Sequence, residues 1–169
     1  MPNLPYEFAP LRTERLLLRL MTVADVDAIH AYQSREDVCR YLPFEPRSRD
    51  EVAAKVAQYA GATTLAADGD YWQLAVERGG GVIGWTLHPD HQGQGYMSEA
   101  ARAVLRIAFE EIGLHRVMAE LDPRNNASIA LCKRLGMREE AYFVEDLWFK
   151  GEWGDTGIYA ILEREWAQR

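Results

Sequence analysis

The stretch HPDHQGQGYMSEA, residues 88–100, places two glycines around one glutamine and then continues into a helical pattern. The first amides of a helix have no partner inside the helix, and they lie at the positive end of its dipole. Such a helix start binds anions, and glycine at 93 and 95 lets a phosphate approach the backbone without meeting a Cβ. The loop therefore predicts a site for a phosphate-bearing ligand.

Two better-known phosphate loops do not fit this stretch. A nucleoside triphosphatase loop ends in Gly-Lys-Ser/Thr, and that ending is absent here. The dinucleotide fingerprint has Gly or Ala where Ser98 stands. What remains is the order Gln92-x-x-Gly95-x-Met97, for which an ordinary glycine-rich turn between a strand and a helix is the alternative interpretation.

The same order resembles the acyl-coenzyme A pyrophosphate loop of the GNAT N-acetyltransferase superfamily, although Met97 departs from the usual Gly or Ala. A second segment, NNASIALCKRLGM at 125–137, resembles the family's later Asn, Ser and helix that ends in Leu-Gly. The opening ERLLLR and the tail GEWGDTGIYAILEREW look like the branch of ribosomal-protein N-terminal (alanine) acetyltransferases. This resemblance covers nearly the whole chain except 60–80.

The resemblance implies an enzyme that moves the acetyl group of acetyl-CoA to a primary amine by direct attack, without a metal. The amine would be a protein N-terminus or a small molecule. The alternative is a GNAT module that binds acyl-CoA without transferring the acyl group. The residues that the resemblance assigns to coenzyme binding are Thr86, Leu87, His88, Gln92, Gly93, Gln94, Gly95, Tyr96, Met97, Ser98, Asn125 and Ser128.

The reaction needs a neutral amine, a donor for the developing oxyanion and a proton or dipole for the leaving thiolate. From reference pKa values, roughly a fifth of an α-amine but only about a thousandth of a lysine is neutral at physiological pH. Glu120, five residues before Asn125, matches the position of a general base in some relatives, and a solvent-facing strand carboxylate is the alternative. Ser128 is expected to act as the proton donor or to cap the helix.

Two other groups of residues are assigned no catalytic or metal-binding role. Cys132 stands where many relatives have a tyrosine acid, but a buried cysteine is a poor substitute, and core packing is the preferred interpretation. The pair His88-x-x-His91 has no third metal ligand placed nearby, so zinc has little support. The general acid stays open.

These residues need elements to position them, and the patterning predicts those elements. Strands are expected at 14–20, 71–77, 82–88 and 115–122, with two more within 141–166 around the turn at 150–152, where Trp148 and Trp153 would pack. Helices are expected from Thr22 to Gln33, from a Ser48–Glu51 capping box to Gly61, over 97–112, and from an Asn cap to Gly136. We therefore expect an α+β fold, a three-layer α/β/α arrangement around a mixed, mostly antiparallel sheet, with the splayed central strands of the GNAT acyl-CoA N-acyltransferase fold.

The sequence shows one strand fewer before the coenzyme loop than the GNAT family pattern has. In the family three antiparallel strands precede the coenzyme loop, whereas this chain shows two, separated by glycines at 79–81. Removing one strand of a meander reverses the next one, which would direct the loop to the wrong end of the sheet. We hypothesise that a hairpin near Val82–Trp85 is missing from these 169 residues, which an intact mass can test.

Bulk properties limit the remaining classes. The 169 residues suit one domain, 1–169, and 48% apolar with 27% charged residues is typical of a soluble globular protein. A net charge of −7 disfavours a nucleic-acid surface. The N-terminus lacks the order of a secretory signal and no long apolar run occurs, so a cytoplasmic monomer or homodimer without membrane contact is expected. Cys39 and Cys132 are expected to be buried thiols.

Overall fold

The computed structural model describes residues 3–66, 74–78, 81–83, 86 and 89–168. The first half of the chain holds short strands and three helices, and the second half holds the longer strands. In chain order the elements are β1 (Tyr6–Glu7), β2 (Leu11–Arg12), β3 (Leu17–Leu20), η1 (Val23–Asp25), α1 (Val26–Gln33), α2 (Glu36–Cys39), α3 (Arg49–Ala60), β4 (Thr64–Leu65), β5 (Leu74–Arg78), β6 (Gly81–Ile83), η2 (Pro89–His91), α4 (Tyr96–Arg106), η3 (Ile107–Glu111), β7 (Arg116–Leu121), α5 (Asn126–Arg134), β8 (Arg138–Phe149), β9 (Glu152–Leu162) and α6 (Glu163–Trp166).

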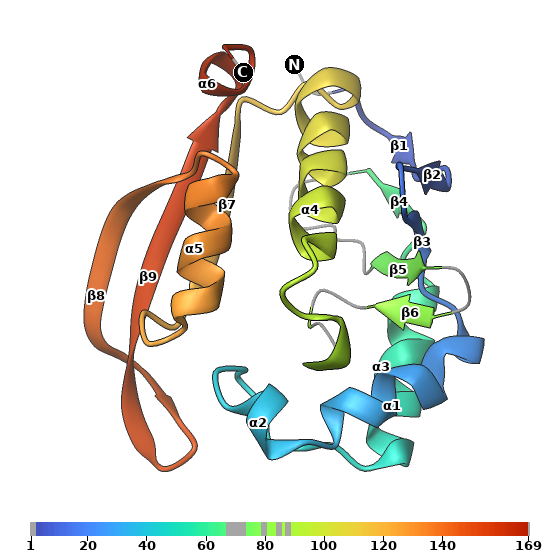
Figure 1. Ribbon diagram of the computed structural model, residues 1–169, viewed down its shortest axis with the longest axis vertical. Helices are drawn as coiled ribbons and strands as arrows, with labels where there is room; N and C mark the ends of the chain where they lie inside the picture. Colours follow the sequence, from blue (N-terminus) through green and yellow to red (C-terminus); the bar gives the residue numbers. More distant parts are fainter. Residues whose placement is uncertain (1–2, 67–73, 79–80, 84–85, 87–88, 169) are drawn as a thin grey trace.

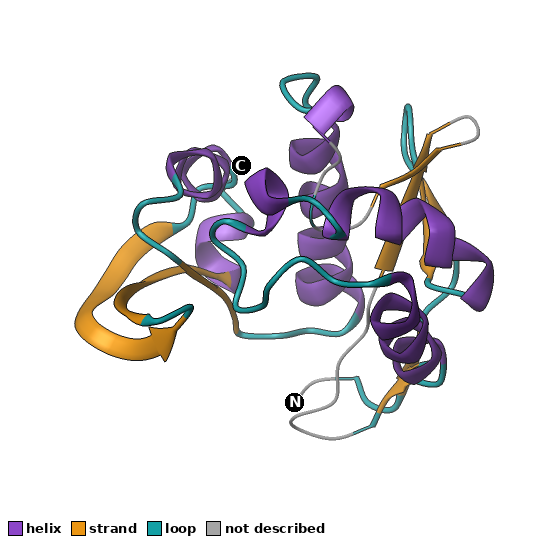
Figure 2. Ribbon diagram, turned by 90° about the horizontal axis from the view of Figure 1, so that it is seen from below, coloured by secondary structure: helices purple, strands orange, loops and turns teal. Residues whose placement is uncertain are grey.

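The described strands form two main sheets, and every described pairing is antiparallel. One sheet has the order β2-β3-β5-β6, the other has the order β7-β9-β8, and β1 pairs separately with β4. In Figure 1 the two sheets stand on either side of α4. Seen from below, the long β8–β9 hairpin curls away from the rest of the molecule (Figure 2). The expected α+β class with mostly antiparallel strands is confirmed.

Helix α4 packs on two sides because it has two apolar stripes. One stripe faces the first sheet and consists of Tyr96, Ala100 and Ala103. It packs with Leu18 of β3 and with Leu16, which directly precedes that strand. The second stripe, Ala101, Leu105 and Phe109, packs with residues of α5 and β9. The polar stripe at Ser98, Arg102 and Arg106 follows at spacings of four residues. Burial on both sides fixes the position of the helix start, which is the predicted phosphate site.

The two N-terminal helices follow their sequence signals. Ser48 and Glu51 form the expected capping box, in which the Ser48 hydroxyl accepts from the Glu51 amide and the Glu51 carboxylate accepts from the Ser48 amide at 2.8 Å. Val26 and Ile29 are buried as predicted, together with Tyr32, against Val52 and Val56 of α3. These residues form a third apolar cluster beneath the first sheet.

Some expectations need correction or lie outside the described part. Helix 97–112 ends in a π-helical turn, with the Ile112 amide donating to the Ile107 carbonyl at 2.9 Å, before Gly113 at φ 78°. Trp148 and Trp153 pack edge to face on each other across the hairpin, as expected, and they remain 57% and 55% exposed. Of the strand expected at 82–88, the structure describes Gly81–Ile83 as β6. No helix among the described residues has the length and apolar character needed to cross a bilayer.

Candidate functional site

The glycine loop ends in an open helix start. Gly93 has φ 73° and Gly95, the N-cap of α4, has φ 80° and ψ 0°, values that favour glycine. No side chain caps this end. In the part of the chain that the structure describes, no protein acceptor binds the amides of Gly93, Gln94, Gly95, Met97 or Ser98. Five donors at the positive end of a helix are thus available to an anion.

An acidic residue in the first turn is directed away from these donors. The Glu99 carboxylate accepts from the Thr13 hydroxyl at 2.5 Å, from the Arg15 amide at 2.9 Å and from the Arg15 Nε at 2.6 Å. Burial alone raises the pKa of Glu99, but the hydrogen bonds from Thr13 and Arg15 together lower it, so Glu99 is an anion at neutral pH. Its charge is compensated by the turn between β2 and β3 and does not repel a phosphate at the loop.

Arg15 also holds the loop directly. Its Nη1 donates to the Gln94 carbonyl at 3.0 Å, and its guanidinium lies 4.7 Å from the centre of the Tyr96 ring. The Gln94 side chain donates to the Asp90 carbonyl at 3.1 Å. The loop therefore has its shape before any ligand arrives, and an arginine lies beside it.

The last residue of α5 contacts the start of α4, and the start of α5 carries a cap of its own. Asn125 is the N-cap, and its side-chain oxygen accepts from the Ser128 amide at 3.0 Å. Arg134 of α5 donates from Nε to the Ser98 hydroxyl at 3.3 Å. The predicted Asn cap is confirmed, and because the cap uses only the carboxamide oxygen of Asn125, its NH₂ group can serve a ligand.

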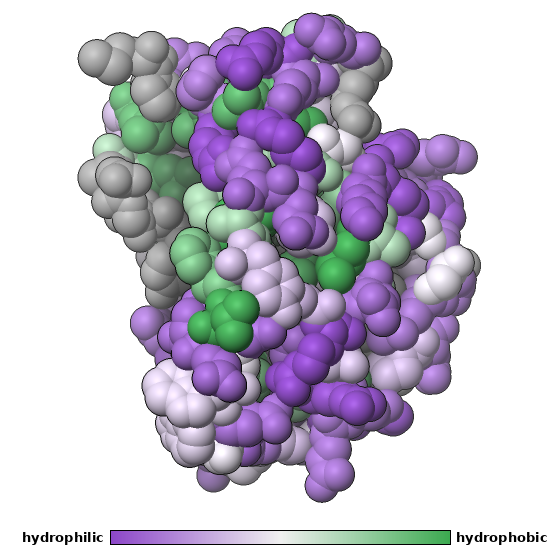
Figure 3. Space-filling view, turned by 90° about the vertical axis from the view of Figure 1, so that its left-hand side faces the viewer, coloured by the Kyte–Doolittle hydropathy of each residue, from purple (hydrophilic) through white to green (hydrophobic). Residues whose placement is uncertain are grey.

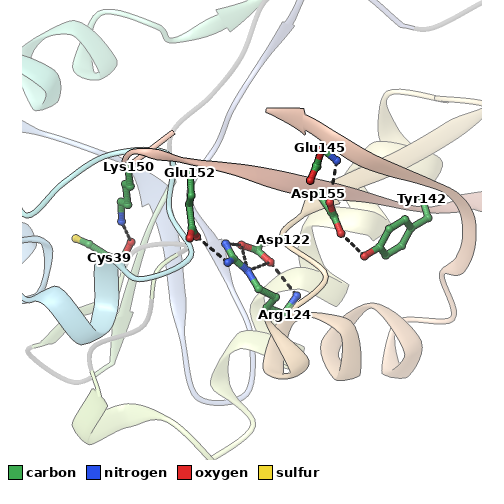
Figure 4. A network of polar contacts seen from close by, with 8 residues as sticks. All are labelled: Cys39, Asp122, Arg124, Tyr142, Glu145, Lys150, Glu152 and Asp155. Carbon is green, nitrogen blue, oxygen red and sulfur yellow. Dashed lines mark hydrogen bonds and ion pairs between the residues drawn. The ribbon is translucent and has the colours of Figure 1, made fainter. Parts of the chain in front are cut away.

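A polar network fixes this helix start to the hairpin turn, as Figure 4 shows. Arg124 donates to Asp122 through Nη2 at 2.7 Å and to Glu152 through Nη1 at 2.8 Å. Two residues before Glu152, Lys150 donates to the Cys39 carbonyl of α2 at 2.5 Å. The turn between β8 and β9 is thereby tied both to α2 and to the residues that precede Asn125.

Glu120 lies on the exposed face of β7. Residues 117, 119 and 121 pack toward α5, so strand alternation places Glu120 on the opposite face from that helix. Among the described strands β7 pairs only with β9, which leaves its other edge without a strand. The structure therefore gives no contact between Glu120 and Ser128. A ligand that passes along the free edge could reach both sides of the strand.

The remaining predicted residues fall into three groups. Leu87 and His88 lie outside the described residues, and Thr86 is half-buried. Tyr96 is buried in the core, so its side chain cannot contact a ligand at the surface. Gln92 is exposed, and Met97 and Ser98 are half-buried at the helix start.

Both cysteines are free, buried thiols as expected. Burial raises the pKa of Cys132, which packs in the core against α4 and β9 and is therefore a thiol and not a thiolate. Within the described ranges no group of three or more His, Cys, Asp or Glu side chains could hold a metal ion.

Two features escaped sequence reasoning. Arg15 contacts the loop from 79 residues away along the chain, and no local pattern links an arginine after β2 with a loop before α4. The second feature is a cavity of about 210 Å³ whose lining includes Tyr32, Gln33, Phe44, Arg47 and Thr86. This cavity lies partly against the segment between α2 and α3, and its lining could not be derived from the sequence.

Comparisons with known proteins identify the family. Residues 15–138 match the family described as Acetyltransferase (GNAT) domain. An uncharacterized N-acetyltransferase of Bacillus subtilis, YnaD, is 33% identical over 168 aligned residues, covering 92% of this chain and 98% of that protein.

Two solved structures are similar to this chain. A GNAT acetyltransferase from Bacillus anthracis has a TM-score of 0.82 and 30% identity, covering 93% of this chain and 100% of that one. The ribosomal L7/L12 α-N-protein acetyltransferase RimL, solved with coenzyme A, has a TM-score of 0.75 at 17% identity, covering 91% of this chain and 98% of that one, so this likeness shows the fold alone. The match over 15–138, together with relatives along nearly the whole chain, shows that this protein belongs to the GNAT acetyltransferase family.

Proposed function

We propose that the protein transfers the acetyl group of acetyl-CoA to a primary amine by direct attack of the amine on the thioester. The observation that carries this proposal is the open start of α4, where Gly93, Gln94, Gly95, Met97 and Ser98 have amides without a protein acceptor. A diphosphate is the part of acetyl-CoA that such donors suit. The coenzyme in the RimL structure and the family's activity support the same ligand.

The arm of the coenzyme would run between the two sheets. The free edge of β7 offers backbone donors and acceptors that no described strand uses. At the end of that edge the Asn125 carboxamide would donate to the arm, and Ser128 would lie within reach of the sulfur, as the resemblance implies. Thr86, with Leu87 and His88, would pair with the arm from the other side.

Glu120 is proposed as the general base that takes the proton of the amine, directly or through a water molecule. Its carboxylate is exposed, which allows an acceptor to approach it. General-base catalysis typically contributes about 100- to 10,000-fold. A non-catalytic acyl-CoA-binding module is the second candidate, favoured by the buried Cys132 at the position where relatives carry an acid.

Thiol release distinguishes these readings. The 169-residue protein is incubated with acetyl-CoA and a broad panel of primary amines, and free CoA thiol is followed. An enzyme releases thiol in proportion to an amine and yields the acetylated amine by mass spectrometry. Binding of CoA without amine-dependent thiol release across the panel would indicate the binding module, and absence of CoA binding would contradict both.

The Glu120→Gln variant tests the base. We expect kcat to fall by at least about 100-fold and the pH dependence of kcat to change, with the KM for acetyl-CoA nearly constant. Full turnover with an unchanged pH profile would remove Glu120 from the mechanism.

A further inference from the structure

A small cavity lies beside the expected path of the coenzyme arm. Its volume is about 210 Å³, and Thr86, assigned above to the coenzyme arm, belongs to its lining together with residues of α1, α3 and the segment between α2 and α3. Ligand pockets for drug-sized molecules are about 300–1,000 Å³, so this cavity suits a smaller compound. Its place makes it the candidate pocket for the acceptor amine.

The floor of the cavity is apolar. Met21, Ile29, Val52 and Val56, which line it, are each at most 5% exposed and form one apolar cluster. Tyr32 belongs to the same cluster, and burial, with the nearby Asp25 charge, raises its pKa to about 12, so its phenol is neutral at physiological pH. This part of the cavity fits an apolar or aromatic body and cannot bind a cation by charge.

Among the described residues of the lining, the two charged ones are both cations, Arg47 and Lys55. The Arg47 guanidinium lies 3.6 Å from the centre of the Phe44 ring, and its Nη1 donates to the Gln33 side chain at 3.1 Å. Within the described part of the chain no carboxylate forms an ion pair with Arg47 or Lys55, and no carboxylate lines the cavity. The nearby Glu51 is held in the capping box with Ser48.

Among the described residues the half-buried Arg47 guanidinium has no direct ion pair: the Glu51 carboxylate interacts with its charge through space but is hydrogen-bonded to Ser48. Burying a charge is costly unless it is paired, so this guanidinium favours an anionic ligand. The Arg47 backbone amide donates to the Gln33 carbonyl at 2.9 Å, and its ring contact fixes the guanidinium, so the side chain is held in place with most of its donors unused. A fixed guanidinium binds carboxylates and phosphates through paired hydrogen bonds, and a carboxylate is the one of these two groups that a free amino acid carries.

From this lining we infer that the acceptor is a small amine that carries a carboxylate and an apolar body, as a free α-amino acid does, and that Arg47 binds that carboxylate. The inference rests on the proposed acetyl transfer and names its substrate class. It runs against the net charge of −7, which by itself favours a cationic acceptor. Local charge decides here, because salt largely screens the interaction between exposed charges that lie more than about 8 Å apart at physiological ionic strength.

A matched acceptor series tests the inference. Thiol release from acetyl-CoA is measured with L-phenylalanine, L-leucine and L-methionine, with the amines formed by their decarboxylation, with their amides, and with spermidine. We expect kcat/KM to be about 10- to 100-fold higher for the amino acids than for their decarboxylated counterparts. The dipeptide Phe-Ala separates a free amino acid from a peptide N-terminus, because its carboxylate is displaced, and we expect it to react poorly.

Variants assign the effect to Arg47. Arg47→Gln should reduce the preference for amino acids over decarboxylated amines by about tenfold or more, while Arg47→Lys retains part of it. Arg49→Gln serves as the matched control, because Arg49 is exposed, pairs with Asp27 and does not line the cavity. Melting temperature and CoA affinity confirm that each variant is folded.

The outcomes separate the inference from the proposed function. Equal or higher kcat/KM for spermidine or for the decarboxylated amines, or a preference unchanged in Arg47→Gln, would overturn the inference and leave acetyl transfer standing. If no amine in either panel releases thiol although CoA binds, acetyl transfer itself is contradicted and the inference falls with it.

Discussion

At the scale of single residues, one side chain can carry two separable roles. Asn125 caps α5 through its carboxamide oxygen, and its NH₂ group is proposed to bind the coenzyme arm. Capping depends on an oxygen acceptor, whereas the coenzyme contact depends on a donor. Stability and affinity therefore report on different atoms of the same residue.

Two substitutions of Asn125 separate these roles. Asn125→Asp keeps the capping oxygen, so we expect the unfolding free energy to change by only a few tenths of a kcal/mol while CoA affinity falls. Asn125→Ala should lose both, with about 1 kcal/mol of stability. Urea denaturation and calorimetric CoA titration measure the two effects. Unchanged CoA affinity in Asn125→Asp would show that Asn125 is only a cap.

At the scale of elements, the features set by residues close in sequence, such as helix caps and helix ends, were predictable. Contacts between residues far apart in sequence were not. The Ser48–Glu51 capping box and the helix end before Gly136 are local features, and the structure confirms them. Glu99 binds Arg15 across a separation of 84 residues, and no periodicity records that pairing. Trp148 and Trp153 pack on each other as predicted, but on the surface, and the local sequence did not tell whether the pair would be buried.

The Glu99 contacts predict a pH-dependent stability. Because the pKa of Glu99 is lowered in the folded protein, its contribution is complete above the pKa of an unfolded glutamate and is lost as the pH falls through the folded value. Glu99→Gln should lower the unfolding free energy at pH 7 by about 1–2 kcal/mol.

Comparing the wild-type protein with the Glu99→Gln variant at several pH values provides the check. Their difference in unfolding free energy should shrink in acid, because the wild-type carboxylate is then protonated as well. Denaturation curves at neutral pH and near pH 3 measure it. A difference that stays constant across this range would mean that Glu99 stabilises the protein by packing and not by its charge.

The glycine loop offers a comparison between two positions with the same backbone conformation. Gly95 and Gly113 have φ 80° and 78°, so alanine at either position should cost about 1–2 kcal/mol. Gly95 belongs to the loop, whereas Gly113 follows η3 at the other end of the same helical segment.

We expect Gly95→Ala to weaken CoA binding by tenfold or more and Gly113→Ala to leave it unchanged at a matched loss of stability. Thermal melting and CoA titration of both variants test this. Equal affinity in the two variants would indicate that the coenzyme does not contact the loop at Gly95.

At the scale of the whole molecule, the surface and the topology raise separate questions. Viewed from the β8 side, apolar side chains lie among hydrophilic ones (Figure 3). The hairpin carries the exposed residues Phe143, Val144 and Leu147, at 49%, 70% and 43%. Among the described residues no neighbouring element covers these three side chains, and they are assigned no partner.

The hypothesis of a missing hairpin concerns the same scale. The YnaD alignment runs over 168 positions but uses 92% of this 169-residue chain, so that relative has residues at positions where this chain has none. An insertion in that relative and a deletion in this chain would both produce this difference, so the missing hairpin stays a hypothesis. Two described strands, β5 and β6, precede the glycine loop, in agreement with the sequence pattern. The intact mass of the protein would establish whether additional residues are present near Val82–Trp85.

The central claim is that the amides at the start of α4 bind the diphosphate of acetyl-CoA. Amide NMR spectra of the protein during titration with coenzyme A test it most directly. We predict that the largest shifts fall on Gly93, Gln94, Gly95, Met97 and Ser98, followed by residues along β7, and that all saturate at one equivalent. Shifts that leave these five amides unchanged while others saturate, or no saturable shift at all, would contradict the account.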